Sequence, residues 1–207
     1  MMYVLLGIQG SGKGTQARFL SKYLELEHIS LGEYFRREVA EKTALGAVAH
    51  KYLSKGHLVP DKKVFQVVED IFAGLGNGFI FDGFPRTLKQ AEYLTNKHPV
   101  DRAIYLKLDD AIARERMKSR RICSNCRKDY NLLVNPPKVE GYCDVCNGAI
   151  VKRADDSNEL IQNRLDLFHK ETKPLIAYYE KIDKLSVVDA VGDIHDVFKD
   201  IIGKIGK

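Results

Sequence analysis

The stretch GIQGSGKGTQ, Gly7–Gln16, decides how the rest of the sequence is interpreted. Its Gly7-x4-Gly12-Lys13 spacing is that of a loop whose backbone N–H groups bind phosphate. The next residue is Gly14, where the common form of such a loop has a Ser or Thr whose hydroxyl binds Mg²⁺. We therefore expect either a chance match or a phosphate-binding loop that arranges its metal ion differently.

The residues on either side of this loop favour the phosphate-binding interpretation. YVLLG, before it, is a buried-strand pattern. After it, one face of a predicted helix carries the apolar residues Ala17, Leu20, Tyr23 and Leu24. In this context the backbone around Gly10, Ser11, Gly12, Gly14 and Thr15 would surround phosphate oxygens at the helix N-terminus, with Lys13 reaching the outer phosphates. A glycine-rich turn that only joins strand to helix is the alternative.

Composition excludes some classes of protein and leaves others open. The chain has 207 residues, of which 44% are hydrophobic and 29% charged, so it can bury a core and is not a disordered tail. Its net charge of +5 favours anionic partners without choosing among nucleotides, nucleic acids and acidic lipids. No apolar run approaches the roughly 18 residues of a membrane span, and the N-terminus has no basic leader. We expect a cytoplasmic protein with no membrane partner.

Apolar strand-like runs alternate with helical patterns along the chain. The predicted strands are residues 2–7, 28–30, 79–82, 102–108 and 185–189. The predicted helices are residues 14–24, 32–41, 62–75, 88–96, 111–120, 158–182 and 194–202. Most of the strands are continuous apolar runs, as in strands covered on both faces. This order predicts an α/β fold with a parallel sheet wrapped by helices.

Two segments do not fit the strand–helix alternation. Residues 31–60 place two helical patterns between strands, and residues 121–156 hold every cysteine with little helical periodicity. We interpret both as insertions into a single domain that spans residues 1–207.

The predicted strand at residues 79–82 lies in GFIFDGFPRT (residues 78–87) and ends in Asp82. An acidic residue at a strand end beside a phosphate loop can organise Mg²⁺ directly or through water. The alternative is an Asp that caps the helix beginning near Thr87. The phosphate loop favours the metal-organising role.

Four cysteines form two pairs within residues 121–156. Cys123-x2-Cys126 and Cys143-x2-Cys146, separated by sixteen residues, match zinc-ribbon spacing. Four thiolates would fill a tetrahedral Zn²⁺ and leave no position for water, so the metal would be structural. Two disulfides are the alternative, which a reducing compartment disfavours.

Several motifs recur in the order found in one enzyme family. They are GIQGSGKGTQ, ISLGEYFR (29–36), GHLVP (56–60), DGFPRT (82–87) with Gln90, RR (120–121), KRADD (152–156) and NRL (163–165). Together they resemble adenylate kinase over essentially the whole chain. The resemblance implies a P-loop NTPase fold with a five-stranded parallel sheet, a helical NMP-binding insertion at residues 30–59 and a small zinc-bearing lid at residues 121–156. It also implies a monomer that transfers the terminal phosphoryl group of ATP to AMP, giving two ADP, in adenine nucleotide homeostasis.

The resemblance also implies roles for individual residues. The catalytic set is Lys13, Arg86, Arg120, Arg153 and Arg164. The ATP site comprises Gly10, Ser11, Gly12, Lys13, Gly14, Thr15, Arg120, Asp129, Tyr130, Val191 and Gly192. The AMP site comprises Leu31, Arg36, His57, Leu58, Val59, Gly83, Phe84, Pro85, Arg86, Gln90, Arg153 and Arg164. Asp82 would hold Mg²⁺ through water, the four cysteines would bind Zn²⁺, and Asp155 and Asp156 would fix the arginines. The family's loop is itself Gly-Lys-Gly-Thr, so Gly14 is its normal form.

The chemistry of phosphoryl transfer supports a catalytic set made of one Lys and several Arg side chains. Phosphoryl transfer spreads charge over oxygens, so positioning and positive charge supply most of the catalysis. The planar fork of arginine binds phosphate bidentately. The acceptor phosphate is already an anion, so the reaction needs no general base.

Two rival interpretations remain at this stage. The first is a nucleic-acid-binding NTPase, which a zinc ribbon in a basic chain with RMKSRR at residues 116–121 also fits. That class leaves DGFPRT and Gln90 unexplained. We therefore expect no nucleic-acid partner. A kinase for another nucleoside monophosphate is the nearer rival. Gln90 favours adenine, whereas Leu31, Glu33 and Tyr34 depart from the usual family residues.

Overall fold

The computed structural model of the chain describes residues 1–74, 78–153 and 156–206. Within these ranges five parallel strands form one sheet in the order β2-β3-β1-β4-β8. Their bounds are Met2–Gly7 (β1), Glu27–Ser30 (β2), Phe79–Asp82 (β3), Arg102–Lys107 (β4) and Leu185–Asp189 (β8). The predicted α/β class and all five predicted strands are confirmed, with Leu108 falling just beyond β4.

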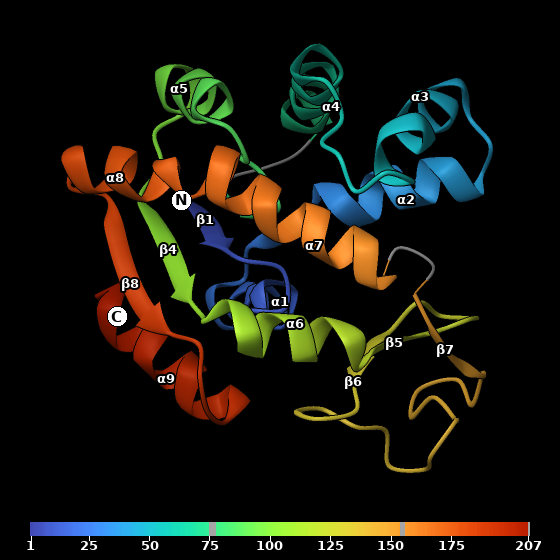
Figure 1. Cartoon of the computed structure of the whole chain (residues 1–207). Helices are drawn as coiled ribbons and strands as arrows, with labels where there is room; N and C mark the ends of the chain where they lie inside the picture. The colour runs from blue at the N-terminus through green and yellow to red at the C-terminus, as the bar shows by residue number, and fades with distance from the viewer. Residues whose placement is uncertain (75–77, 154–155, 207) are drawn as a thin grey trace.

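Helices cover both faces of this sheet (Figure 1). Their bounds are Lys13–Leu24 (α1), Leu31–Ala40 (α2), Ala44–Leu53 (α3), Asp61–Gly74 (α4), Leu88–Lys97 (α5), Asp110–Lys118 (α6), Asn158–Leu167 (α7), Pro174–Lys181 (α8) and Ile194–Lys204 (α9). Alternate residues of β1 enter opposite cores, because successive side chains of a strand point to opposite faces. Val4 and Leu6 pack with α2, α4, α5 and α8, whereas Tyr3 and Leu5 pack with α1, α6, α7 and α9.

The carboxyl ends of the central strands place the phosphate loop beside Asp82. β1 pairs with both β3 and β4, and Leu5 is the register partner of Asp82. The loop that leaves β1 at Gly7 therefore emerges next to the end of β3. Ligands of open α/β sheets bind at this edge, where successive connections leave in opposite directions.

Residues 30–59, the helical insertion, contain α2 and α3 packed against each other. Ser30 and Thr43 cap these helices by accepting hydrogen bonds from the backbone N–H groups of Glu33 and Gly46. A Cβ at Gly46 would overlap the carbonyl oxygen of Glu38, so glycine is what lets the two helices approach. The two helical patterns predicted between strands here are confirmed.

Residues 120–152, the cysteine lobe, form a separate three-stranded antiparallel sheet in the order β6-β5-β7. The strands are Arg120–Cys123 (β5), Asp129–Asn131 (β6) and Ile150–Lys152 (β7). Figure 1 shows this lobe projecting from the end of α6, away from the main sheet. The predicted helix 111–120 is wrong at its end, because Ser119 caps α6 and Arg120 already belongs to β5.

The predicted single helix 158–182 is also wrong. A π-helical turn at Phe168–Thr172 separates α7 from α8, and the N–H of Lys173 bonds the carbonyl of Phe168, five residues earlier. Pro174 explains the change, because its ring carries no N–H and clashes with the carbonyl four residues before it. The hydroxyl of Thr172 in this turn donates to the carbonyl of Arg86 at 2.9 Å.

Candidate functional site

The phosphate loop adopts a backbone that only glycine readily provides. Gly10 and Gly12 have φ values of 89° and 90°, in the left-handed region. Gly12 is the N-cap of α1 and offers no side chain to cap it. The first N–H groups of α1 therefore point to an anion site at the positive end of the helix.

Lys13 lies inside this loop. Its Nζ donates to the carbonyls of Gly7 and Ile8 at 2.7 and 2.9 Å. Burial lowers the pKa of Lys13 to about 8; the nearby Asp82 carboxylate opposes that change, and Arg86 and Arg120 reinforce it. An ammonium has three protons to donate, so a phosphate can still accept one from Lys13 and would favour its charged form.

Gly14 allows Asp82 to approach the loop. A Cβ at Gly14 would lie 3.2 Å from Oδ2 of Asp82, closer than side-chain carbons normally come. A Ser or Thr at this position would therefore displace the carboxylate. The Asp82 carboxylate is thus an oxygen donor next to the loop, of the kind that binds Mg²⁺.

Two arginines converge at the start of α2. A Cβ at Gly32 would lie 3.2 Å from Nη1 of Arg36 and 3.6 Å from Nη2 of Arg86. Arg86 is held from the other side, because its Nε donates to the carbonyl of Gly83 at 2.9 Å. Burial lowers the pKa of Arg86, as do Arg164 and Arg153, while Asp82 raises it. Two guanidinium groups at a helix N-terminus form a strong site for a phosphate.

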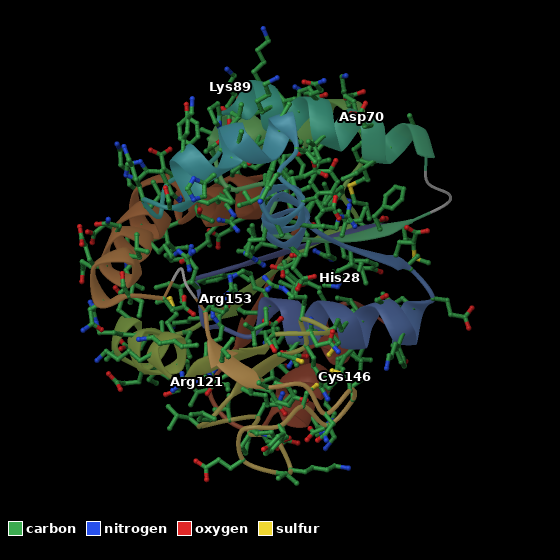
Figure 2. All side chains as sticks on the ribbon, turned by 90° about the vertical axis from the view of Figure 1, so that its right-hand side faces the viewer. His28, Asp70, Lys89, Arg121, Cys146 and Arg153 are labelled. Atoms are coloured by element: carbon green, nitrogen blue, oxygen red, sulfur yellow. The ribbon has the colours of Figure 1, made fainter. Side chains whose placement is uncertain are left out.

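Asp156 organises a second group of arginines. Its side chain is fully buried and accepts two hydrogen bonds from Arg120, at 2.8 and 2.6 Å, and one from Arg164 at 3.2 Å. Nη1 of Arg153 lies 3.9 Å from Oδ1 of Asp129. Figure 2 labels Arg153 where the cysteine lobe meets the main body. The prediction that Asp156 fixes the arginines is confirmed for Arg120 and Arg164, whereas Asp155 lies outside the described residues.

These groups line one cleft with a cavity volume of about 240 Å³. Most of the predicted site residues line it: Gly10, Ser11, Gly12, Lys13, Gly14, Thr15, Leu31, Arg36, His57, Leu58, Val59, Asp82, Gly83, Arg86, Gln90, Arg120, Asp129, Tyr130, Arg153, Arg164 and Gly192. Three other residues of the predicted nucleotide sites do not. Phe84 is buried in the core against Phe81, Pro85 borders a smaller neighbouring cavity, and the side chain of Val191 is exposed.

Further cleft residues were not assigned to a site from the sequence, among them Gln16, Arg18, Arg116 and Asn131. Gln16 belongs to the quoted loop motif, and its amide donates to the carbonyl of Ile194 at 2.9 Å. Arg116 donates to the carbonyl of Ala190 at 3.0 Å. Both partners are far away in the sequence, so the local signals were the phosphate-loop motif for Gln16 and the basic run at residues 116–121 for Arg116.

His28, labelled in Figure 2, lies in β2, which pairs with the strand that ends in Asp82. Burial lowers the pKa of His28, with Asp82 opposing that change. The side chain is therefore neutral at pH 7 and does not border the cleft. A packing role agrees with this placement.

The four cysteines gather in the cysteine lobe, where Figure 2 labels Cys146. All four sulfurs lie within 4.8 Å of one another, with Cys123 and Cys146 3.4 Å apart and Cys126 and Cys143 3.5 Å apart. Four ligands about 2.3 Å from a tetrahedral Zn²⁺ would be about 3.8 Å apart, so the cluster has the size of such a site. These separations are too long for the disulfide alternative, since bonded sulfurs lie about 2.05 Å apart.

Tyr130 is buried against the cysteine cluster and hydrogen-bonds to one of its sulfurs. Its hydroxyl donates to the sulfur of Cys143 at 3.3 Å and accepts from the backbone N–H of Asp144 at 2.8 Å. Burial and the adjacent Cys143 sulfur raise the pKa of Tyr130, so its hydroxyl stays protonated. A fixed donor to a ligand sulfur is typical of the surroundings of a metal site.

Across the described ranges, no helix is both long enough and apolar enough to span a bilayer. The sequence model of the family described as Adenylate kinase matches residues 5–184. A protein of Ruminiclostridium cellulolyticum named adenylate kinase is 44% identical over 213 aligned residues, which cover 100% of both chains. An adenylate kinase of Clostridium novyi is 41% identical over 99% of this chain and 98% of its own. One of Caldicellulosiruptor bescii is 40% identical over 100% of this chain and 99% of its own.

Proposed function

The chain belongs to the adenylate kinase family, and from this premise we propose how its cleft carries out the reaction. The enzyme transfers the terminal phosphoryl group of ATP to AMP, giving two ADP, and uses ATP together with Mg²⁺. One observation carries the assignment of residues. A single cleft is lined by Lys13 of the phosphate loop and by Arg36, Arg86, Arg120, Arg153 and Arg164.

The donor phosphates would bind the loop at residues 10–15. The first N–H groups of α1 and the Lys13 ammonium would hold them, since both carry positive charge in a largely water-excluded place. Mg²⁺ supplies charge neutralisation on the donor phosphates. Asp82, which approaches the loop closely at Gly14, would hold that ion through water.

The acceptor phosphate would bind where Arg36 and Arg86 converge at Gly32. The supporting contact is the bond from Arg86 Nε to the carbonyl of Gly83, which fixes one guanidinium in place. The N-terminus of α2 adds its own positive end at this point. Leu31, His57, Leu58 and Val59 line the cleft near this site, and Gln90 would contact the acceptor base.

The phosphoryl group in transfer would be surrounded by Arg120, Arg153 and Arg164. Asp156 bonds Arg120 bidentately and Arg164 singly, so these cations are oriented before substrate binds. Such preorganised charge stabilises the developing charge of the transition state. The attacking phosphate oxygen is already anionic, so we assign no general base.

Residues 121–156 would act as a lid. They carry Asp129 and Tyr130, for which we propose a donor-nucleoside role together with the backbone near Val191 and Gly192. Arg120 and Arg153 lie at the entry to and exit from the cysteine lobe, so its closure would move both arginines toward the phosphates. Closure would also exclude water that would otherwise accept the phosphoryl group.

We further propose that the four cysteines bind structural Zn²⁺, that the enzyme is a monomer and that it works in the cytoplasm. The cluster size supports zinc, and four thiolate ligands suit a reducing compartment. The monomer rests on the family resemblance and on a cleft whose lining comes from one chain. Zinc analysis of the purified protein and light scattering after gel filtration would test the first two assignments.

A coupled ADP assay tests the acceptor and donor assignments. AMP, CMP, UMP and GMP would be compared as acceptors, each with ATP and with GTP as donor. We expect AMP with ATP to give the highest kcat/KM. A preference for CMP or UMP would overturn the assignment of the acceptor base.

A further inference from the structure

The side-chain amide of Gln90 is held at both ends. Its Oε1 accepts from the backbone N–H of Arg86 at 2.8 Å, and its Nε2 donates to Oδ1 of Asp61 at 2.7 Å. Gln90 is only 2% exposed, and the part that remains accessible borders the cleft. Its orientation is therefore determined by these two neighbours.

Neither neighbour tolerates a reversed amide. A backbone N–H can only donate and a carboxylate can only accept, so turning the amide over would oppose two donors at Arg86 and two acceptors at Asp61. The α5 cap reinforces this arrangement, because Thr87 Oγ1 accepts from the backbone N–H of Gln90. The result resembles a capping box in which the Gln side chain returns to the start of the helix.

We propose that Asp61 is a positioning residue that makes the acceptor site select 6-amino over 6-oxo purines. The inference rests on the proposed role of Gln90 in contacting the acceptor base. Adenine presents a ring-nitrogen acceptor beside its amino donor, which matches the second Nε2 proton and the second Oε1 lone pair of Gln90. Hypoxanthine and guanine present an oxo acceptor in place of the amino group, so it would face Oε1 of an amide that cannot turn.

Asp61 acts through Gln90 and not on the substrate. It is the first residue of α4, its side chain is half-buried, and it does not line the cleft. A site built to pair hydrogen bonds rejects a mismatched analogue strongly, because its polar groups are left without partners. Selection of 6-amino over 6-oxo purines therefore depends on Asp61, which does not touch the base, as well as on Gln90, which would contact it.

The test compares AMP with inosine monophosphate (IMP) as acceptors for Asp61→Asn. The new amide can either donate or accept, so only the Arg86 N–H still opposes a reversed Gln90 amide. We expect the ratio of kcat/KM for AMP to that for IMP to fall about five- to tenfold, mainly through KM. Asp70→Asn is the matched control, because Asp70 is exposed on the outer side of the same helix (Figure 2) and its ratio should equal that of the unchanged enzyme.

A double variant distinguishes positioning from a general structural effect. In a Gln90→Ala background, Asp61→Asn should leave the AMP-to-IMP ratio unchanged, because the residue through which Asp61 acts is gone. Melting temperatures would establish that each variant is folded. Two outcomes would overturn the inference but leave the acceptor-base assignment standing. One is an AMP-to-IMP ratio that Asp61→Asn does not alter in the otherwise unchanged enzyme. The other is an equal change of that ratio in the Gln90→Ala background. An unchanged enzyme that does not prefer AMP to IMP would overturn the acceptor-base assignment and the inference together.

Discussion

Gly14 lies where a side-chain carbon would crowd the carboxylate of Asp82. Its Cα faces Asp82, and a Cβ would lie 3.2 Å from that carboxylate. Gly14 is also the second residue of α1, a helical position where alanine is intrinsically favoured over glycine. Helix propensity and the approach of Asp82 therefore oppose each other at this residue.

We predict that Gly14→Ala lowers kcat/KM for ATP about tenfold without lowering the melting temperature, because the displaced carboxylate and loop misplace the donor phosphates. Steady-state kinetics and thermal melting measure the two effects. Gly203→Ala, in α9 with open space around its Cα, is the control and should only stabilise, by roughly 0.5–1 kcal/mol. Wild-type kinetics in Gly14→Ala would contradict the steric argument.

We predict that Lys13 makes binding of the donor nucleotide dependent on pH. Burial lowers its pKa to about 8, so in the free enzyme the ammonium loses its proton as pH rises through that value. Phosphate binding requires the cation. The affinity for a non-hydrolysable ATP analogue should therefore be constant below pH 8 and fall up to tenfold per pH unit above it.

Titration calorimetry between pH 6.5 and 9.5 would measure this dependence on Lys13. Lys13→Arg is the control, since a guanidinium keeps its charge throughout that range. Its affinity should be lower at every pH, because the longer side chain does not fit the loop carbonyls, but should not decline further above pH 8. A decline of equal size in both proteins would assign the titration to another group.

At the scale of elements, Tyr130 connects β6 to the cysteine cluster. Its hydroxyl bridges the Cys143 sulfur and the Asp144 backbone, so it fixes the direction of one ligand. We predict that Tyr130→Phe lowers zinc affinity about tenfold while all four sulfurs remain, as is usual when a supporting hydrogen bond of a metal site is lost. Competition with a chromogenic chelator measures the affinity.

Tyr142→Phe provides the matched control for that experiment. Tyr142 lies in the same lobe, but its side chain is 53% exposed and is not among those bonded to a cysteine sulfur within the described residues. The same change there should leave zinc affinity and melting temperature unaltered. Equal losses in the two variants would show that ring substitution, and not the hydroxyl bridge, affects the cluster.

The elements also show which parts of the fold were predictable. Strands such as Phe79–Asp82 were found nearly to the residue, because burial on both faces leaves a continuous apolar run. β6 is only three residues long and is stabilised by pairing with β5 and by the cysteine cluster, so it leaves no periodic signal. The π-helical turn before Pro174 did have a local signal, the proline itself, which the apolar periodicity of α7 and α8 concealed.

The candidate site divides in the same way. Lys13 and Arg86 sit in contiguous motifs whose spacing alone indicates phosphate binding. The contacts of Asp61 with Gln90 and of Thr172 with Arg86 join residues 29 and 86 positions apart. Such pairs depend on how the helices pack, and a single sequence does not encode them locally.

At the scale of the whole molecule, the cysteine lobe is separable from the nucleotide-binding core. Its small cluster of Cys123, Tyr130 and Cys143 is distinct from the two large clusters on either face of the main sheet. Its entry and exit also lie side by side, because Arg121 and Lys152 are register partners in the β5–β7 pair. Removing the lobe should therefore leave the core folded.

We predict that replacing residues 122–151 with a two-residue Asn-Gly turn abolishes efficient transfer while nucleotide still binds. A turn of this type closes an antiparallel pair, so Arg120, Arg153 and Asp156 keep their places in the chain. Without the lobe, water reaches the phosphates and the arginines lose the movement that brings them together. AMP phosphorylation should fall on the order of 100-fold or more, and the share of ATP lost to hydrolysis should rise.

Separate assays of ADP and inorganic phosphate would measure transfer and hydrolysis in that shortened enzyme. Circular dichroism and AMP titration would establish that the core is folded and its acceptor site intact. Tyr142→Phe, which keeps the whole lobe and changes only an exposed side chain, should retain a transfer-to-hydrolysis ratio close to that of the unchanged enzyme. Full transfer activity in the shortened enzyme would contradict the lid assignment, because the core alone would then suffice to exclude water and assemble the arginines around the phosphates.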